Sequence, residues 1–151
     1  MKEDLLQRAG AVLRAVRKRR PLVHQLTNYV TVNDCANATL AIGASPIMAD
    51  DIAEAADIAA LASAVVLNIG TLNTRTVESM LAAGKAANAR GIPVVLDPVG
   101  AGASPLRNRT VERLLKEIRF AAIRGNLSEI RFVAGAQAAA GDYQQCPQAC
   151  S

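Results

Sequence analysis

The sequence is poor in aromatic residues. Among its 151 residues there is no tryptophan, and two tyrosines and two phenylalanines bring the aromatic share to 3%. Proteins that bind single-stranded nucleic acid stack the bases on aromatic side chains, so this scarcity argues against that class. No stretch approaches the roughly 18 consecutive apolar residues that cross a bilayer. We therefore expect neither a nucleic-acid partner nor membrane contact.

Histidine and cysteine are also scarce. The single histidine, His24, lies within an apolar stretch, which predicts a position in the core or at a strand end rather than a catalytic one. Three cysteines form no disulfide framework, and this favours a reducing, cytoplasmic location. Cys35 lies on an apolar helical stripe and is expected in the core. Cys146 and Cys150 have no histidine or further cysteine near them, so we expect no zinc site there.

The charge balance is basic, with 17 Lys and Arg against 13 Asp and Glu and a net charge of +4. Much of the excess lies between residues 14 and 20. Such a run contacts nucleic acid or an anionic surface in some proteins, but it also suits the last turn of a helix, where cations interact favourably with the dipole. We favour the helix end, because no aromatic residues accompany the run.

Alanine, valine, leucine and isoleucine make up most of the apolar half of the chain. Short, continuously apolar stretches alternate with helical stripes, which predicts one α/β domain with a mostly parallel sheet and helices on both of its faces. The strands are predicted at residues 22–26, 45–48, 64–69, 92–97 and 120–123. The helices are predicted from residue 5 to before Pro21, over 32–40, after a cap at Asp50 or Asp51, from a cap at Thr74 to about Arg90, over 111–118, and from near Ser128.

Small or polar residues follow four of the predicted strands. They are Thr27–Asn28, Asn68–Thr71, Asp97–Gly102 and Arg124–Glu129. The carboxyl ends of parallel strands lie at one edge of the sheet, where open α/β proteins bind their ligands. We therefore expect these four segments to converge on a single site.

Asp97 is the first candidate for chemistry at this edge. A carboxylate at a strand end suits Mg²⁺, directly or through water, although an aspartate also caps the backbone of turns. We favour the functional role because Gly100 and Gly102 follow and allow close approach of the backbone. This G-x-G lacks the third glycine of a dinucleotide fingerprint and the Gly-Lys-Ser/Thr of a P-loop, so a dinucleotide-binding domain is the less favoured alternative.

Arg124, Asn126 and Glu129 form the second candidate cluster. Arginine binds phosphate through two parallel hydrogen bonds, and the other two side chains share one face at a helix start. They also fit a capping arrangement with Asn126 at the N-cap and Glu129 three residues later. The two interpretations are compatible, because a capped helix N-terminus also attracts anions. Met48 either lines an apolar ligand pocket or fills the core, and taken alone it favours the core.

Five motifs, in order, resemble the hydroxyethylthiazole kinase family, over about residues 21–135. They are PLVHQLTN at Pro21–Asn28, AIGASPIM at Ala41–Met48, LNIGTL at Leu67–Leu72, LDPVGAG at Leu96–Gly102 and AAIRGN at Ala121–Asn126. The resemblance implies a ribokinase-like α/β fold. It also implies a kinase of thiamine biosynthesis or salvage that uses ATP and Mg²⁺ to phosphorylate the hydroxyl of 4-methyl-5-(2-hydroxyethyl)thiazole. The family is a homotrimer with active sites near the subunit contacts.

The resemblance assigns seven positions of this sequence to three parts of a site. They are Met48, Asn28 and Gly70 in the thiazole pocket, Arg124 and Asn126 at the ATP, and Asp97 and Glu129 at the metal. A thioether beside a sulfur heterocycle is chemically sensible, and phosphoryl transfer depends mainly on positioning and charge neutralisation.

The family continues well beyond Ser151, and its Gly-rich anion-hole loop lies in the part that this sequence lacks. We therefore expect residues 1–140 to be the N-terminal part of a kinase domain that is incomplete at its C-terminus, followed by a disordered tail outside the family pattern at 141–151. No residue here takes the catalytic role, so we expect the chain to be inactive, or nearly so, by itself. The alternatives are another ribokinase-like small-molecule kinase and a non-catalytic nucleotide- or thiazole-binding fragment.

Overall fold

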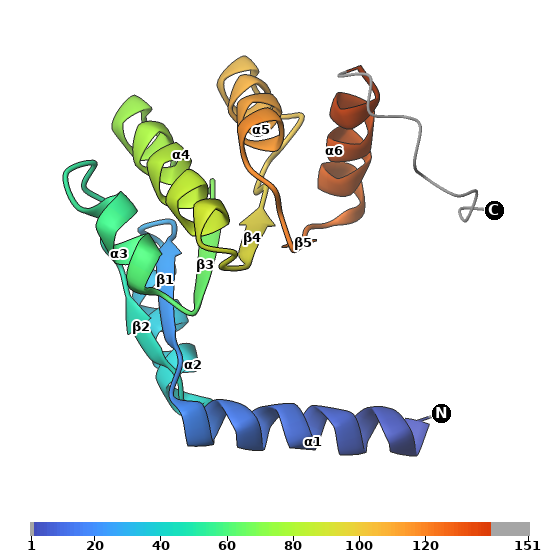
Figure 1. Cartoon of the computed structure of the whole chain (residues 1–151). Helices are drawn as coiled ribbons and strands as arrows, with labels where there is room; N and C mark the ends of the chain where they lie inside the picture. The colour runs from blue at the N-terminus through green and yellow to red at the C-terminus, as the bar shows by residue number, and fades with distance from the viewer. Residues whose placement is uncertain (1, 140–151) are drawn as a thin grey trace.

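The computed structural model describes residues 2–139, and this part of the chain contains a five-stranded parallel sheet (Figure 1). The strand order is β2-β1-β3-β4-β5. The strands are β1 (Leu22–Leu26), β2 (Ser45–Ile47), β3 (Ala64–Asn68), β4 (Val94–Asp97) and β5 (Ala122–Ile123). Every pairing is parallel, which confirms the predicted type of sheet.

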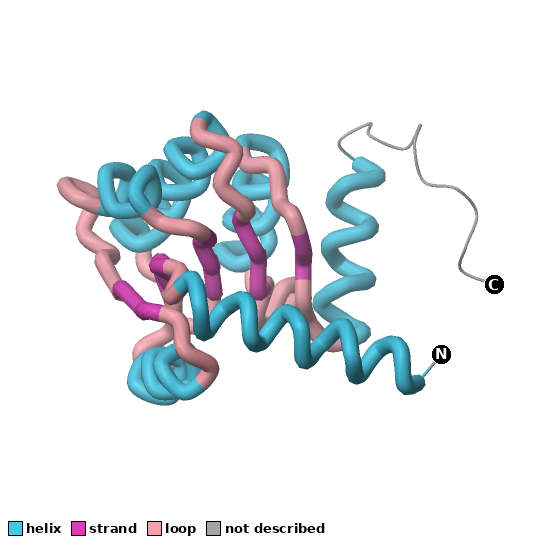
Figure 2. The backbone as a smooth tube through the Cα atoms, turned by 60° about the horizontal axis from the view of Figure 1, so that its bottom comes forward, coloured by secondary structure: helices cyan, strands magenta, loops and turns pink. Residues whose placement is uncertain are grey.

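Helices lie on both faces of this sheet, as predicted (Figure 2). The helices are α1 (Lys2–Arg19), α2 (Val32–Ala41), α3 (Ala55–Leu61), α4 (Thr74–Ala89), α5 (Pro105–Glu117) and α6 (Leu127–Ala139). Helix α2 contacts one face, where Gln25 Nε2 of β1 donates to Thr39 Oγ1 of α2 at 2.8 Å. Helices α3, α4 and α5 cover the other face. Strand β2 is added on one side of β1, and β3, β4 and β5 are added on the other. Right-handed crossovers in these two opposite directions place α2 and the later helices on opposite faces.

The hydrophobic core lies between the sheet and helices α3, α4 and α5. Val65 and Leu67 of β3 and Val94 and Leu96 of β4 are fully buried and alternate with less buried neighbours along each strand. Burying one such side chain contributes about 1.5–3 kcal/mol. His24 belongs to this face as well, because it pairs with Val65 and is fully buried, which confirms its predicted core position.

Two predicted helix caps are wrong. Asn73, rather than Thr74, caps α4, because its side chain accepts from Thr76 N–H and forms a reciprocal capping box with Thr76. Neither Asp50 nor Asp51 caps α3, which begins only at Ala55. The Asp51 carboxylate instead accepts from Ala53 N–H in a turn that precedes the helix. A turn of this kind leaves no periodic pattern of apolar residues. The apolar spacing that predicted the helix therefore did not show that a turn precedes it.

The apolar stripe of α1 does not face a core in this structure. Leu5, Leu6 and Val12 are largely exposed, and α1 extends away from the sheet (Figure 1). The basic residues Arg17, Lys18 and Arg19 form the last turn of α1, as expected for a helix end.

Two smaller expectations also differ from the structure. Cys35 is half-buried rather than a core residue, with its Sγ 3.9 Å from the hydroxyls of Thr27 and Thr31. Strand β5 is only two residues long, and Phe120 packs partly buried against the core just before it. The predicted boundary at residue 140, the tail, Cys146 and Cys150 lie outside the described residues. None of the helices within residues 2–139 has the length and hydropathy to cross a membrane.

Candidate functional site

Polar side chains from four strand ends form one hydrogen-bonded chain at the carboxyl edge of the sheet. Asn28, after β1, donates its Nδ2–H to Asn68 Oδ1 at 3.1 Å. Asn68, at the end of β3, donates its own Nδ2–H to Asp97 Oδ2 at 2.6 Å. Arg124, after β5, donates to the same oxygen at 2.5 Å. Sequence reasoning placed these segments at one edge, and the structure brings the side chains into contact.

Asp97 has an environment that suits a metal or phosphate site. The residue is only 5% exposed, and this burial raises the pKa of its carboxyl above the ordinary value, while Arg124 and the amide of Asn68 oppose the rise. Its Oδ2 carries two hydrogen bonds, and no hydrogen bond from the described residues reaches Oδ1. One carboxylate oxygen is therefore held and the other is available to a cation or to water bound to a cation.

The donor set fits Mg²⁺ better than a metal enclosed by protein. Among the described side chains of residues 4–136, no three aspartate, glutamate, histidine or cysteine residues gather into a metal-binding group. Mg²⁺ keeps several waters and binds through one or two carboxylates and substrate phosphates. A single available carboxylate oxygen at Asp97 is compatible with that mode.

Asn126 and Glu129 form a capping box at the start of α6. Asn126 Oδ1 accepts from Glu129 N–H at 3.0 Å, and Glu129 Oε2 accepts from Asn126 N–H at 2.8 Å. The other oxygen, Oε1, accepts from Gly100 N–H at 2.9 Å. Both carboxylate oxygens of Glu129 thus accept hydrogen bonds from backbone N–H groups. The predicted capping arrangement of this cluster is therefore present in the structure. In this arrangement Glu129 fits a metal less well than Asp97 does.

The glycine loop after β4 is held by side chains rather than open to a ligand. Gly100 and Gly102 have φ values of 71° and 92°, a left-handed conformation that favours glycine. Their N–H groups donate to Glu129 Oε1 and Asn108 Oδ1. A Cβ at Gly100 would lie 3.2 Å from Cδ of Arg107. These glycines therefore allow the loop to fold against α5 and α6.

Met48 lines a small cavity of about 80 Å³ beside the strand ends. Its walls are Gln25, Thr27, Tyr29, Val32, Met48 and Asp50. Tyr29 donates its hydroxyl hydrogen to Asp50 Oδ2 at 3.0 Å, which joins the loop after β1 to the loop after β2, and this bond raises the pKa of the phenol.

Asn28 and Gly70 lie next to each other rather than in the wall of that cavity. A Cβ at Gly70 would come within 2.8 Å of the Asn28 Cβ, so the loop after β3 reaches Asn28 only because residue 70 is glycine. Gly70 N–H donates to Asn68 Oδ1 at 2.9 Å. The pair therefore belongs to the hydrogen-bonded chain that ends at Asp97.

Sequence reasoning missed the roles of Asn68 and Arg107. Asn68 stands inside a predicted strand-end segment, and the signal that could have identified it is its position at the last residue of a strand paired with the strand of Asp97. Arg107 lies in the first turn of α5, and nothing in its local pattern indicates the contacts described below.

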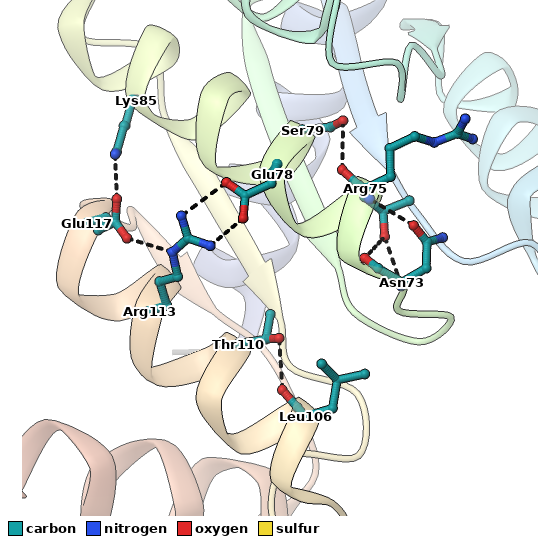
Figure 3. A network of polar contacts seen from close by, with 10 residues as sticks. Asn73, Arg75, Glu78, Ser79, Lys85, Leu106, Thr110, Arg113 and Glu117 are labelled. Atoms are coloured by element: carbon teal, nitrogen blue, oxygen red, sulfur yellow. Dashed lines mark hydrogen bonds and ion pairs between the residues drawn. The ribbon is translucent and has the colours of Figure 1, made fainter.

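A second polar cluster joins α4 to α5 away from these strand ends (Figure 3). Arg113 pairs with Glu78 and Glu117, and Lys85 also pairs with Glu117. Arg113 lowers the pKa of Glu78, and Lys85 together with Arg113 lowers that of Glu117. Exposed ion pairs of this type contribute little to stability. The cluster links the exposed sides of the two helices, and its members have no place in the site at the strand ends.

Known proteins match this chain over most of its length. The family model of the hydroxyethylthiazole kinase family matches residues 13–142. A hydroxyethylthiazole kinase of Clostridium beijerinckii is 62% identical over 135 residues, which are 89% of this chain and 49% of the relative. One of Desulfovibrio desulfuricans is 68% identical over 129 residues, 85% of this chain and 45% of the relative. The chain thus spans about half the length of the curated relatives it matches.

The fold agrees with this relationship. The solved structure of hydroxyethylthiazole kinase from Pyrococcus horikoshii superposes with a TM-score of 0.79 at 45% identity, and the match covers 86% of this chain and 51% of that one. The predicted ribokinase-like α/β fold is therefore confirmed. Sequence, family model and architecture agree that the chain belongs to the hydroxyethylthiazole kinase family.

Proposed function

We propose that the full-length protein transfers the γ-phosphate of ATP to the hydroxyl of 4-methyl-5-(2-hydroxyethyl)thiazole, in thiamine biosynthesis or salvage. Membership of the family supports this reaction. The observation that carries it is the buried carboxylate of Asp97, held between Asn68 and Arg124 at the edge where the strand ends meet.

Arg124 is the residue that we assign to the phosphates of ATP. Its side chain is 73% exposed, and the contact with Asp97 uses one of its terminal nitrogens. A guanidinium carries five N–H donors, so it can hold Asp97 and still donate to phosphate oxygens. Asp97 would hold Mg²⁺ through Oδ1 or through a water. Mg²⁺, when bound, neutralises charge on the transferring phosphate, the main requirement of this chemistry.

The acceptor side of the site is assigned to Met48, Asn28 and Gly70. Met48 supplies a polarisable thioether to the cavity and suits contact with a sulfur heterocycle. Asn28 and Gly70 both hydrogen-bond to Asn68, the residue whose amide binds Asp97, so they connect the acceptor side to the carboxylate.

Asn126 and Glu129 act indirectly in this proposal. Their capping box fixes the start of α6, and Glu129 binds Gly100 of the loop that follows Asp97. The metal role that the resemblance implies for Glu129 stays a prediction, as does contact of Asn126 with ATP. The structure supports a part for both residues in holding the glycine loop.

The test is an assay of ADP release by the full-length protein with ATP, Mg²⁺ and the thiazole alcohol. We expect turnover, a kcat/KM that exceeds that for pyrimidine and sugar alcohols, and a raised KM for the thiazole in Met48→Ala. Preference for a different alcohol would contradict the assignment. The expectation that residues 1–151 alone are inactive stays a prediction, and assaying that chain in parallel tests it.

The assembly and partners that were expected also stay predictions. Size-exclusion chromatography with light scattering tests the homotrimer, and a gel-shift experiment tests the absence of a nucleic-acid partner. Fractionation of cells tests the cytoplasmic location.

A further inference from the structure

Arg107 binds three backbone carbonyls with one guanidinium group. One terminal nitrogen donates to Ile69 O and to Val99 O, both at 2.6 Å, and the other donates to Gly70 O at 2.8 Å. Among the side chains that the structure describes, in residues 4–136, no carboxylate lies within ion-pair distance of Arg107. The positive charge is therefore balanced by backbone dipoles rather than by an acid.

The three carbonyls come from two different loops. Ile69 and Gly70 follow β3 and lead to the Asn28 side of the site, whereas Val99 follows β4 two residues after Asp97. Strands β3 and β4 end side by side at Asn68 and Asp97, and beyond that register the ladder stops. Beyond the last strand pair, the hydrogen bonds of Arg107 connect the loop after β3 to the loop after β4.

The local structure is built around this side chain. Arg107 lies at the third position of α5, where its N–H donates to the N-cap Ser104. A Cβ at Gly100 would lie 3.2 Å from the Arg107 Cδ, so a larger residue there would press on this side chain. The guanidinium reaches the three carbonyls from two terminal nitrogens that are fixed in one plane. Lysine keeps the charge but lacks that fork.

We propose that Arg107 is a positioning residue for phosphoryl transfer: by binding Ile69, Gly70 and Val99 it sets the distance between the acceptor loop and the loop that follows Asp97. The catalytic part of this proposal rests on the proposed function, whereas the structural part does not. If Arg107 aligns the acceptor loop with the loop that follows Asp97, its loss should lower kcat strongly. The KM for the thiazole and the KM for ATP should change little, because each substrate still binds to its own loop.

The experiment compares Arg107→Lys and Arg107→Met with Arg109→Met, a control at an exposed arginine on the same helix. Amide hydrogen exchange of the 151-residue chain reports the loops directly. We expect exchange in residues 69–72 and 98–103 to accelerate about tenfold in both Arg107 variants, since a tenfold change corresponds to about 1.4 kcal/mol, the size of one to two lost hydrogen bonds. Arg109→Met should leave both segments unchanged.

The same variants in the full-length protein test the catalytic role. A 1 Å misplacement costs about 10²-fold in rate, so we expect kcat per folded molecule to fall about 10²-fold in Arg107→Met and less in Arg107→Lys. Circular dichroism gives the folded fraction, which separates misalignment from unfolding.

Unchanged exchange in the two segments overturns the proposal, and so does faster exchange with an unaltered kcat. A large rise in KM with constant kcat overturns it as well, because that pattern indicates lost binding rather than lost alignment. If the unmodified protein does not phosphorylate the thiazole alcohol, the proposed function fails, while the exchange experiment still decides whether Arg107 holds the loops.

Discussion

Asn68 and Asp97 are register partners at the ends of β3 and β4, and the Asn68 amide donates to the Asp97 carboxylate at 2.6 Å. The carbonyl oxygen of the same amide accepts from Gly70 N–H and from Asn28 Nδ2. One side chain therefore orients the carboxylate, the loop after β3 and the residue after β1. Few side chains other than asparagine offer a donor and an acceptor at this reach.

Replacing Asn68 by alanine should disturb all three neighbours. We expect a loss of about 1–3 kcal/mol in the free energy of unfolding, because polar groups at a half-buried site lose their partner. We also expect the pKa of Asp97 to rise further, since the amide hydrogen bond opposes the rise. Denaturant titration measures the first effect, with Asn33→Ala in the exposed part of α2 as the control. Equal stabilities of the two variants would contradict the role given to Asn68.

Asp97→Asn should separate stability from function. Burial raises the pKa of Asp97 in the folded state above the 3.8 of an ordinary aspartate. At pH values between 3.8 and the folded-state pKa, the folded protein therefore binds more protons than the unfolded chain, and stability falls as pH rises. At pH values above the folded-state pKa, the loss of stability caused by the buried, ionised carboxylate is constant. A neutral asparagine removes this loss. At pH 7 we expect stability equal to or above that of the unmodified protein and, in the full-length protein, a kcat reduced by about 10²–10³-fold. Destabilisation with retained turnover would rule out both expectations.

The sheet and the convergence of its strand ends could be predicted because they depend on continuous apolar runs and on chain direction. Residues 64–68 and 94–97 are buried strands of this kind, and parallel pairing fixes which ends meet. The same reasoning selected Asp97 and Arg124 as candidates, and the structure brings their side chains into contact. Their part in phosphate chemistry stays a prediction.

Contacts between distant side chains could not be predicted in the same way. Arg107 is separated by 38 residues from Ile69, and its role depends on how a loop turns back over the sheet. The exposed face of α1 and the late start of α3 were missed for a related reason: a helical stripe indicates an apolar face but not whether anything packs on it.

His24 should make stability depend on pH. Burial lowers its pKa below 6.5, only partly offset by the Ala49 carbonyl and the charge of Glu54. Its Nε2 donates to Ala49 O at 2.7 Å, and among the described residues its Nδ1 is buried without a partner. Below about pH 6.5 the unfolded chain takes up a proton that the folded chain refuses, so stability falls as pH falls.

Denaturant titrations from pH 7.5 to pH 5 of the unmodified protein and of His24→Gln measure this effect. Glutamine can still donate to Ala49 and does not titrate, so carboxylates common to both proteins cancel in the difference. We expect the stability advantage of the unmodified protein to shrink with acid. A difference that is independent of pH would show that His24 does not titrate in this range.

Gly84 should tolerate no side chain while Ile118 is present. It lies buried in the middle of α4, and a Cβ there would overlap the Cδ1 of Ile118, which follows α5. Alanine at this position gains about 1 kcal/mol in helix propensity, but overpacking a core costs about 1–3 kcal/mol. We therefore expect Gly84→Ala to lower the midpoint of denaturant unfolding. Adding Ile118→Val removes Cδ1, the nearest of the overlapping atoms, but keeps Cγ1 at 2.9 Å, so it should recover part of the loss. Purely additive effects of the two substitutions would contradict direct contact between them.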